Sequence, residues 1–161
     1  MFTAALHRIR RPLSSALLAA ATLASGWIAL PSAAHAQEFV SIKGNTVNVR
    51  AQPNTRAQVQ WELSKGYPLQ VTARQGQWLK VRDYESTLGW VHRPQTHAQA
   101  HHVVKARTAN LRNGPGTHHR VVAKLEQHEV VRTLEKRAGW AKVRNSAGAQ
   151  GWVARNLLWG W

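Results

Sequence analysis

Apolar and polar residues alternate in short runs through most of the chain after residue 36, and a period of two is typical of strands with one buried face. The alternating apolar positions of the first such stretch are Val47, Val49, Val59, Trp61, Leu63, Leu69, Val71, Leu79, Val81 and Trp90. Turn-forming residues separate the runs, as in Lys65-Gly66 and Gln75-Gly76. One short helical turn is expected, at Ala154 to Leu158. The pattern predicts an all-β protein of many short strands, as in a small barrel or sandwich.

The strand pattern occurs twice, at a constant offset of 62 residues. Residues 43–92 and 105–154 are identical at 15 of 50 positions, and no insertion interrupts the comparison. The shared positions include Asn48 and Asn110, Arg50 and Arg112, Trp78 and Trp140, and the segments Gly89-Trp90-Val91 and Gly151-Trp152-Val153. Because a fixed period identifies the structural unit, we expect each copy to form one small domain with the same loop lengths.

The first 36 residues have a different character. A basic segment, His7 to Arg11, precedes an almost wholly apolar run from Leu13 to Leu30, and Ala34-His35-Ala36 forms a small-x-small site. This order is typical of a secretory signal peptide, so we expect cleavage before Gln37 and a periplasmic or secreted protein without a stable membrane span. The alternative is a retained membrane anchor, since the run is close to the roughly 18 residues that can span a bilayer.

The chain contains no cysteine, so disulfides, thiolate metal ligands and a cysteine nucleophile are all excluded. Small exported domains often depend on disulfides, and a domain of about 60 residues buries only about 60% of its unfolded surface. Seven of the eight tryptophans follow residue 36, and each large aromatic side chain can bury about 150–250 Å². We therefore expect Trp78, Trp90, Trp140 and Trp152 to pack in the cores.

The second copy carries the landmarks of a known family. Its segments Thr108 to Thr117, Gly139 to Arg144 and Gly151-Trp152-Val153 resemble, in order and spacing, the bacterial SH3-like (SH3b) domain. The resemblance covers nearly all of the chain after the signal peptide, once per copy. It implies two tandem SH3-like small β-barrels, each partly open and of five or six strands, in an exported protein whose modules bind the cell wall. We expect a signal peptide over 1–36, domain 1 over 37–94, a linker over 95–101 and domain 2 over 102–161.

The two copies differ in two places. Glycines flank Pro115 in the second copy, whereas Gln52 and Asn54 flank Pro53 in the first. Because glycine tolerates left-handed turns, we expect the first loop to follow the same path with more strain. The first copy also lacks the leucines that follow the Gly-Trp-Val landmark of the second, which predicts a less completely closed barrel.

Basic residues dominate the part that follows residue 36. It holds 19 of the 22 Lys and Arg residues and all seven Asp and Glu residues, which gives a net charge of +12. Basic proteins collect on anionic polymers and membranes, so the candidate partners of an exported chain are peptidoglycan, lipopolysaccharide and anionic lipids rather than nucleic acid. No block of five like charges occurs, and an evenly charged, solvated surface is an equally open interpretation.

Metal binding has little support in the sequence. His97, His101 and His102 lie in or beside the expected linker, and His118-His119 lies in a turn, with no acidic residue adjacent to any of them. Catalytic zinc sites usually combine three ligands on a fixed scaffold. We expect surface histidines, and no metal or other cofactor.

Catalysis also has little support. No Gly-x-Ser-x-Gly segment occurs. The nearest carboxylate pairs, Asp83 with Glu85 and Glu126 with Glu129, fall at expected turns, whereas glycan cleavage needs two carboxylates facing one cleft. We expect the protein not to be an enzyme. A hydrolytic interpretation stays open only if carboxylates or a metal assemble across the two copies.

Three aromatic residues are candidates for ligand binding because they differ between the copies. The counterparts of Trp61, Tyr67 and Tyr84 are Ala123, Glu129 and Ser146. Positions that differ are poor candidates for a shared core. Aromatic and arginine residues are the usual anchors of binding sites, so we predict that Trp61, Tyr67 and Tyr84 bind the ligand.

Arg50, Arg112 and Trp159 complete the predicted ligand-binding set. A guanidinium fork suits carboxylates, although a structural role is equally open for both arginines. Trp159, in Trp159-Gly160-Trp161, either covers a barrel end or contacts a partner or membrane interface.

Taken with the resemblance, these residues lead us to expect a non-catalytic exported protein that attaches to peptidoglycan or another anionic envelope component. The alternative is an adaptor that binds an envelope protein, such as a partner enzyme or membrane complex, and has no affinity for glycan. Binding of Pro-rich peptides is not expected, because it needs an aromatic-lined groove whose Tyr-rich signature neither copy contains.

Overall fold

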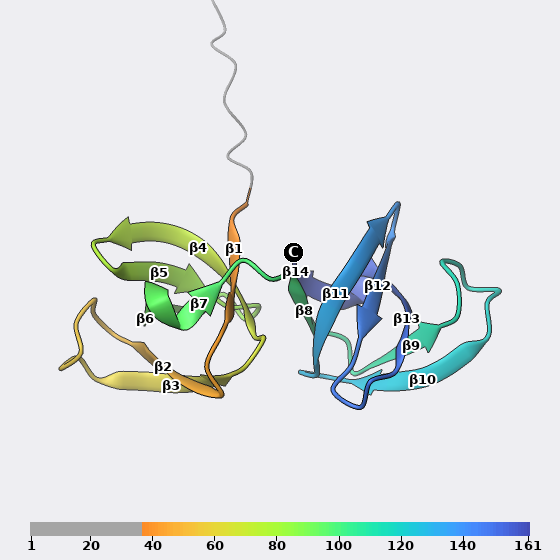
Figure 1. The fold of residues 1–161 in the computed structure, drawn as a ribbon, viewed down its shortest axis with the longest axis horizontal. Helices are drawn as coiled ribbons and strands as arrows, with labels where there is room; N and C mark the ends of the chain where they lie inside the picture. Colours follow the sequence, from red (N-terminus) through yellow and green to blue (C-terminus); the bar gives the residue numbers. More distant parts are fainter. Residues whose placement is uncertain (1–36) are drawn as a thin grey trace, which may run out of the picture. The chain divides into compact units, whose positions relative to one another are not determined.

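The computed structural model describes residues 37–161, which form two β-domains in sequence order (Figure 1). The predicted signal peptide lies outside the described residues. Between residues 37 and 161 the chain forms strands, turns and two single-turn 3-10 helices, which confirms the all-β class. Within that range, no helix has the length and apolar character needed to cross a membrane.

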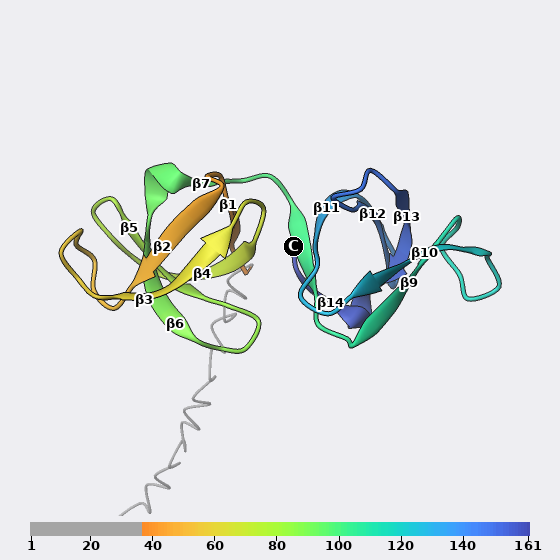
Figure 2. The same cartoon turned by 90° about the horizontal axis from the view of Figure 1, so that it is seen from below.

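Domain 1 is one antiparallel sheet of seven strands, in the order β3-β2-β6-β5-β4-β1-β7 (Figures 1 and 2). Its elements are β1 (Phe39–Ile42), β2 (Thr46–Arg50), β3 (Val59–Ser64), β4 (Pro68–Gln75), β5 (Trp78–Arg82), β6 (Leu88–His92), η1 (Arg93–Gln95) and β7 (Thr96–His97). The resemblance implied five or six strands. The seventh is the two-residue closing strand β7, which pairs with β1.

Domain 2 repeats this topology, in the order β10-β9-β13-β12-β11-β8-β14. Its elements are β8 (His101–Val104), β9 (Thr108–Arg112), β10 (Val121–Glu126), β11 (Val130–Arg137), β12 (Trp140–Arg144), β13 (Gln150–Ala154), η2 (Arg155–Leu157) and β14 (Leu158–Gly160). The helical turn expected at Ala154 to Leu158 is present as η2.

Bulges at equivalent places bend both sheets. In domain 1 the register shifts between Val71 and Ala73, where β4 stops pairing with β1 and continues along β5. Domain 2 has the same shift between Thr133 and Glu135 in β11. A bulge bends a strand and increases its twist. The bends in β4 and β11 let each sheet curl into a small barrel (Figure 2).

Each domain has its own aliphatic core. The fully buried side chains of domain 1 include Ile42, Val49, Leu69, Val81 and Val91, and those of domain 2 include Val104, Leu111, Leu125, Val131, Val143 and Val153. Both cores lie within residues 37–161, so this part of the chain has what it needs to fold by itself.

The expectation that tryptophan forms the core is wrong for three of the four landmark residues. Trp78, Trp90 and Trp140 are half-buried, and only Trp152 is buried, with 6% of its surface exposed. The strand period explains this, because the neighbours of these tryptophans are the residues that point inward. The Arg137 guanidinium covers the Trp152 ring at 5.1 Å, a cation–π contact on the outer side of the barrel.

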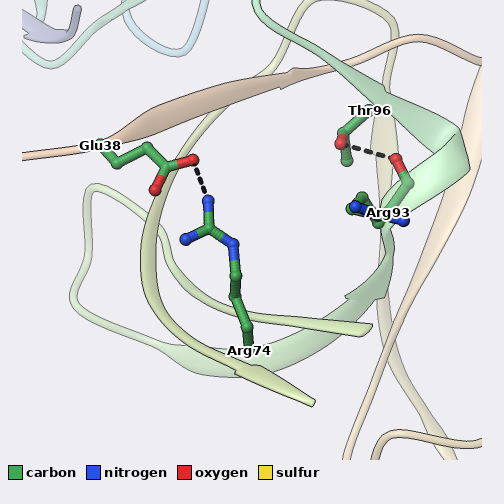
Figure 3. A network of polar contacts seen from close by, with 4 residues as sticks. All are labelled: Glu38, Arg74, Arg93 and Thr96. Carbon is green, nitrogen blue, oxygen red and sulfur yellow. Dashed lines mark hydrogen bonds and ion pairs between the residues drawn. The ribbon is translucent and has the colours of Figure 1, made fainter. Parts of the chain in front are cut away.

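The two barrels close differently. In domain 2, β14 contributes the buried Leu158 and pairs with β8 over three residues. In domain 1, β7 has two residues and neither is buried. Figure 3 shows two exposed polar contacts of this domain: the Arg74 guanidinium donates to the Glu38 carboxylate, and the Thr96 hydroxyl donates to the Arg93 carbonyl oxygen at 2.8 Å.

The predicted linker, residues 95–101, belongs mostly to regular secondary structure. Thr96 and His97 form β7, and β8 begins at His101. Residues 98–100 are therefore the only part of this segment that belongs to no strand or helix.

The left-handed backbone positions lie elsewhere than expected. The glycines beside Pro115 are not among the residues with positive φ, so the predicted extra strain in the loop of Pro53 is wrong. Positive φ occurs instead at Ser86 (69°) in domain 1 and at His128 (71°) in domain 2, where the opposite copies carry glycine. Gly114 lies close to the His119 ring: a Cβ there would be 2.5 Å from it, so the ring would have to turn aside.

Candidate binding pocket in domain 1

Three of the six predicted binding residues meet at one pocket. Trp61 from β3, Tyr67 from the turn before β4 and Tyr84 from the β5–β6 turn line a hollow of about 450 Å³. The pocket is completed by Leu63, Asp83, Glu85, Thr87 and His128. The sheet order brings Trp61 and Tyr84 together: β3 is the edge strand and pairs with β2, β2 pairs with β6, and the β5–β6 turn leads into β6.

The β5–β6 turn is held by the Asp83 carboxylate. Asp83 is 8% exposed, and its Oδ1 accepts the backbone N–H groups of Glu85 at 3.0 Å and Thr87 at 2.8 Å. In domain 2 the side-chain oxygen of Asn145 accepts the N–H of Ala149 at 2.8 Å at the equivalent place. Aspartate and asparagine commonly hold turns in this way, and the prediction that this carboxylate lies at a turn is confirmed.

Tyr84 is fixed by contacts at its hydroxyl. The phenol oxygen lies 2.7 Å from Glu85 Oε1, to which it donates, and 2.6 Å from His128 Nε2. The Tyr84 and His128 rings lie 5.5 Å apart between centroids. Domain 2 therefore supplies one side chain to the pocket of domain 1.

Both pocket tyrosines stay protonated at neutral pH. Burial, and then the negative charge of Asp83, raises the pKa of Tyr67 well above its usual value. Desolvation and the hydrogen bond to Glu85 raise the pKa of Tyr84 to about 12. Each phenol can therefore act as a hydrogen-bond donor.

The indole N–H of Trp61 is a further donor. It is buried and has no hydrogen-bond partner within the described residues. A buried donor without a partner is costly, and an acceptor would reach the Trp61 N–H only if the side chains around it moved.

The equivalent positions of domain 2 carry neither the aromatic residues nor the Asp83 and Glu85 carboxylates of the pocket. Trp61, Tyr67 and Tyr84 correspond to Ala123, Glu129 and Ser146, while Asp83, Glu85 and Thr87 correspond to Asn145, Ala147 and Ala149. The aromatic and acidic lining that domain 1 supplies to the pocket therefore has no equivalent in domain 2. Comparison of the copies found the aromatic residues, and it would also have found Asp83 and Glu85 if their place in a turn had not led us to set them aside.

Arg50 and Arg112 brace equivalent loops. Arg50 Nη1 donates to the carbonyl oxygen of Ala57 at 2.7 Å, and Arg112 Nη1 donates to that of His119 at 2.7 Å. Neither arginine lines the aromatic pocket. Arg50 also borders a separate hollow of about 210 Å³ with Trp78 and His92. The structural role is therefore observed, and binding of a carboxylate stays a prediction.

Replacing Arg112 with methionine should loosen the loop of residues 113–120. Methionine keeps the apolar stem and loses the charged hydrogen bond to His119, which is worth about 1.5–3 kcal/mol. We expect faster amide hydrogen exchange in the loop and a lower free energy of unfolding. Arg107→Met, at an exposed arginine of the same domain, is the control. Equal exchange in both variants would show that Arg112 does not brace the loop.

Trp159 lies outside the pocket. Its ring meets Phe39 edge to face at 5.2 Å between centroids, and Trp161 Nε1 donates to Ser41 Oγ at 3.3 Å. Both contacts join β14 or the residue after it to β1. The observed role of Trp159 is packing, and its contact with a ligand stays a prediction.

The histidines considered as metal ligands lie in separate places. The His118 and His119 rings lie 4.1 Å apart and tilted, and His97 stacks on His101 at 5.9 Å between centroids. The expectation of surface histidines is wrong for His101 and His102, which are buried in β8, and His102 Nδ1 lies 2.6 Å from the Thr133 hydroxyl. Among residues 37–161, no three His, Cys, Asp or Glu side chains are grouped so as to hold a metal ion.

The repeated, strongly bent seven-stranded sheet defines a protein of two tandem small β-barrels, with an aromatic and acidic pocket in the first. The family model described as "Bacterial SH3 domain" matches residues 43–97 and again residues 105–160, and the chain belongs to this family. The resemblance seen in the sequence is thereby confirmed.

Several known proteins are similar to parts of this chain. The relative named "Putative N-acetylmuramoyl-L-alanine amidase YrvJ", from Bacillus subtilis (strain 168), is 25% identical over 134 residues, which cover 76% of this chain and 26% of that protein. The chain thus spans about a quarter of that relative. Among solved structures, NlpC2 from Trichomonas vaginalis has 14% identity and a TM-score of 0.36, over 77% of this chain and 48% of its own. An NlpC/P60 family protein from Bacillus cereus ATCC 10987 has 13% identity and a TM-score of 0.36, over 76% and 56%.

Proposed function

We propose that this protein is a non-catalytic binding protein of the bacterial envelope, exported to the periplasm or beyond, that attaches to peptidoglycan through its tandem bacterial SH3 domains. The observation that carries the proposal is the pocket of Trp61, Tyr67 and Tyr84, which gives domain 1 a concave, aromatic surface of the kind that binds ligands. Family membership and the amidase relative support the choice of ligand. The name of that relative refers to N-acetylmuramoyl-L-alanine, a unit of peptidoglycan.

The placement of the carboxylates supports a role without catalysis. Asp83 accepts two backbone N–H groups, and Glu85 accepts the Tyr84 hydroxyl. The other weighed pair, Glu126 and Glu129, lies in the β10–β11 turn, where Glu129 Oε2 accepts the N–H of Glu126 at 3.1 Å. Each pair serves its own turn, and the two turns belong to different domains.

Co-sedimentation with isolated peptidoglycan tests the proposal. We expect residues 37–161 to pellet with the wall at low salt and to keep part of that binding at high salt. Contact with the aromatic rings does not depend on charge, whereas the range of surface charges shrinks from about 10 Å at 0.1 M to about 3 Å at 1 M. Tyr84→Ser, the residue of domain 2, should weaken high-salt binding by about tenfold or more if Tyr84 is a binding anchor.

Trp140→Ala is the matched aromatic control, since Trp140 in β12 is half-buried, lies outside the pocket and does not belong to the predicted binding set. Binding that disappears entirely at high salt would mean that charge acts alone. Absence of binding at either salt concentration would contradict attachment to peptidoglycan and favour the adaptor function.

A further inference from the structure

The charge of the pocket is opposite to the charge of the chain. After residue 36 the chain has 19 basic and seven acidic residues, yet two of the seven, Asp83 and Glu85, line the pocket and no Lys or Arg does. An anionic ligand group would meet two carboxylates there. The pocket is therefore built for a different chemistry from the basic surface around it.

The carboxylate charges are not required by the fold. Asp83 holds the β5–β6 turn through Oδ1, and in domain 2 the neutral side chain of Asn145 holds the equivalent turn through its oxygen. Glu85 corresponds to Ala147, so the turn also forms without that side chain. The turn needs an acceptor oxygen at position 83, and a neutral asparagine would supply one. The negative charge of Asp83 therefore has no role in holding the turn, and we assign it to ligand binding.

The aromatic residues suit the same kind of ligand group. The faces of Trp and Tyr rings attract cations, and aromatic pockets are a common means of binding ammonium groups. Tyr67 and Tyr84 are neutral at physiological pH, as tyrosines ordinarily are, and desolvation, followed by the nearby carboxylates, raises their pKa values further, so they add no third negative charge. A neutral sugar could stack on these rings and donate its hydroxyls to carboxylate oxygens, but a neutral acceptor such as an amide oxygen would serve it as well, and only a cationic group gains from the two negative charges.

We propose that the pocket formed by Trp61, Tyr67, Tyr84, Asp83 and Glu85 binds a primary ammonium group on the peptide part of peptidoglycan. This inference rests on the proposed function and names the part of the wall that is recognised. The carboxylates pair with the ammonium charge, and the rings surround its alkyl stem. Because His128 and Glu85 both contact the Tyr84 hydroxyl, the ring is already held in place before the ligand arrives.

The Asp83→Asn variant separates this proposal from attraction by net charge. It keeps the turn-holding oxygen, as Asn145 does, and makes the protein more basic. If charge alone bound the protein to an anionic wall, Asp83→Asn would bind at least as tightly as the unchanged protein. Recognition of ammonium predicts the opposite, a loss of about tenfold in affinity at high salt. Asn145→Asp places the same charge where domain 2 has no aromatic pocket, and should give no gain.

Chemical acetylation of the wall is a second test of ammonium recognition. Acetylation of the free amines in isolated peptidoglycan removes the ammonium groups and leaves the glycan intact. At high salt, the unchanged protein should bind untreated wall and lose about tenfold in affinity for acetylated wall, whereas Asp83→Asn should bind both equally weakly. Unchanged affinity for acetylated wall, or undiminished binding by Asp83→Asn, would overturn the ammonium proposal and leave wall attachment standing.

A soluble probe distinguishes failure of the pocket chemistry from failure of the wall proposal. Nα-acetyl-lysine amide should change the tryptophan fluorescence of the unchanged protein, and less so that of Asp83→Asn, whereas the same compound acetylated on its side-chain amine should have no effect. Response to the probe without binding to any wall would overturn the peptidoglycan source and point to lysine side chains of a protein partner. No response to the probe, together with equal binding to both walls, would overturn the ammonium proposal itself.

Discussion

Gly151→Ala should unfold domain 2 under conditions in which the unchanged protein is folded. A Cβ at this position would lie 2.5 Å from the backbone oxygen of Arg112 and 2.9 Å from Leu111 Cγ. A backbone atom cannot move aside as a side chain can, and β13 meets β9 at this point through the pairing of Trp152 with Arg112. Overpacking of this kind costs about 1–3 kcal/mol and sometimes more, and we expect the upper end because β9 must shift.

The measurement is urea unfolding followed by amide NMR signals, read separately for each domain. Domain 2 should lose its signals at a lower urea concentration in Gly151→Ala, while the signals of the domain 1 core should persist longer. Gly116→Ala is the matched control, because a Cβ there meets the exposed ring of His118, which can turn away. Equal midpoints for the two variants would show that β9 and β13 have room for a methyl group.

Acid should destabilise domain 2 between about pH 6.5 and pH 4, the range bounded by the pKa values of His102 in the unfolded and folded states. His102 in β8 is 3% exposed, and burial lowers its pKa to about 4, against the effect of a hydrogen bond with the backbone of Trp161. Nearby Lys136 and Arg155 lower it further. Burial also lowers the pKa of His101. The unfolded chain therefore binds protons in this range while the folded domain does not.

The sign follows from that difference. The free energy of unfolding rises with pH wherever the unfolded state binds more protons, so stability is complete above about pH 6.5 and is lost as the pH falls toward 4. At about 1.4 kcal/mol per pKa unit, His102 contributes about 3 kcal/mol to this loss. Urea unfolding of domain 2 at pH 7 and pH 4.5 measures it. His102→Gln removes the titrating group and should flatten the pH dependence, whatever its stability at pH 7. An unchanged slope would show that His102 is not responsible.

The fold was predictable because its signals are local and repeated. The period of two located the strands, and the constant offset between the copies showed that there are two domains. The tryptophans were misplaced although the sequence contains the necessary signal: in Trp78-Leu79-Lys80-Val81-Arg82 the tryptophan shares a face with lysine and arginine, while leucine and valine share the other. Side-chain size was given more weight than the face on which the side chain lies.

The candidate site was predictable only in part. Differences between the copies identified the three aromatic residues, because a pocket present in one domain leaves its counterpart free to change. Asp83 was set aside as a turn residue, yet one carboxylate can hold a turn and also carry charge into a pocket. Contacts that depend on the path of the backbone could not be predicted from the sequence. Examples are the hydrogen bond from Arg112 to the His119 carbonyl oxygen and the contact between His128 and the Tyr84 hydroxyl.

Strand order has a consequence for how the chain folds as it emerges during synthesis. Half of the neighbouring strands in each sheet are consecutive in the chain, and the other half are distant: β2 pairs with β6 and β9 with β13. In the same way, β1 pairs with residues 68–70 and 96–97, and β8 pairs with residues 130–132 and 158–160. Such distant pairings form slowly. Domain 1 can close once residue 97 is available, whereas domain 2 must wait for residues 158–160. A chain interrupted before β14 would therefore carry a finished first barrel and a second with β8 unpaired on one side, an open edge that strands of other molecules can join.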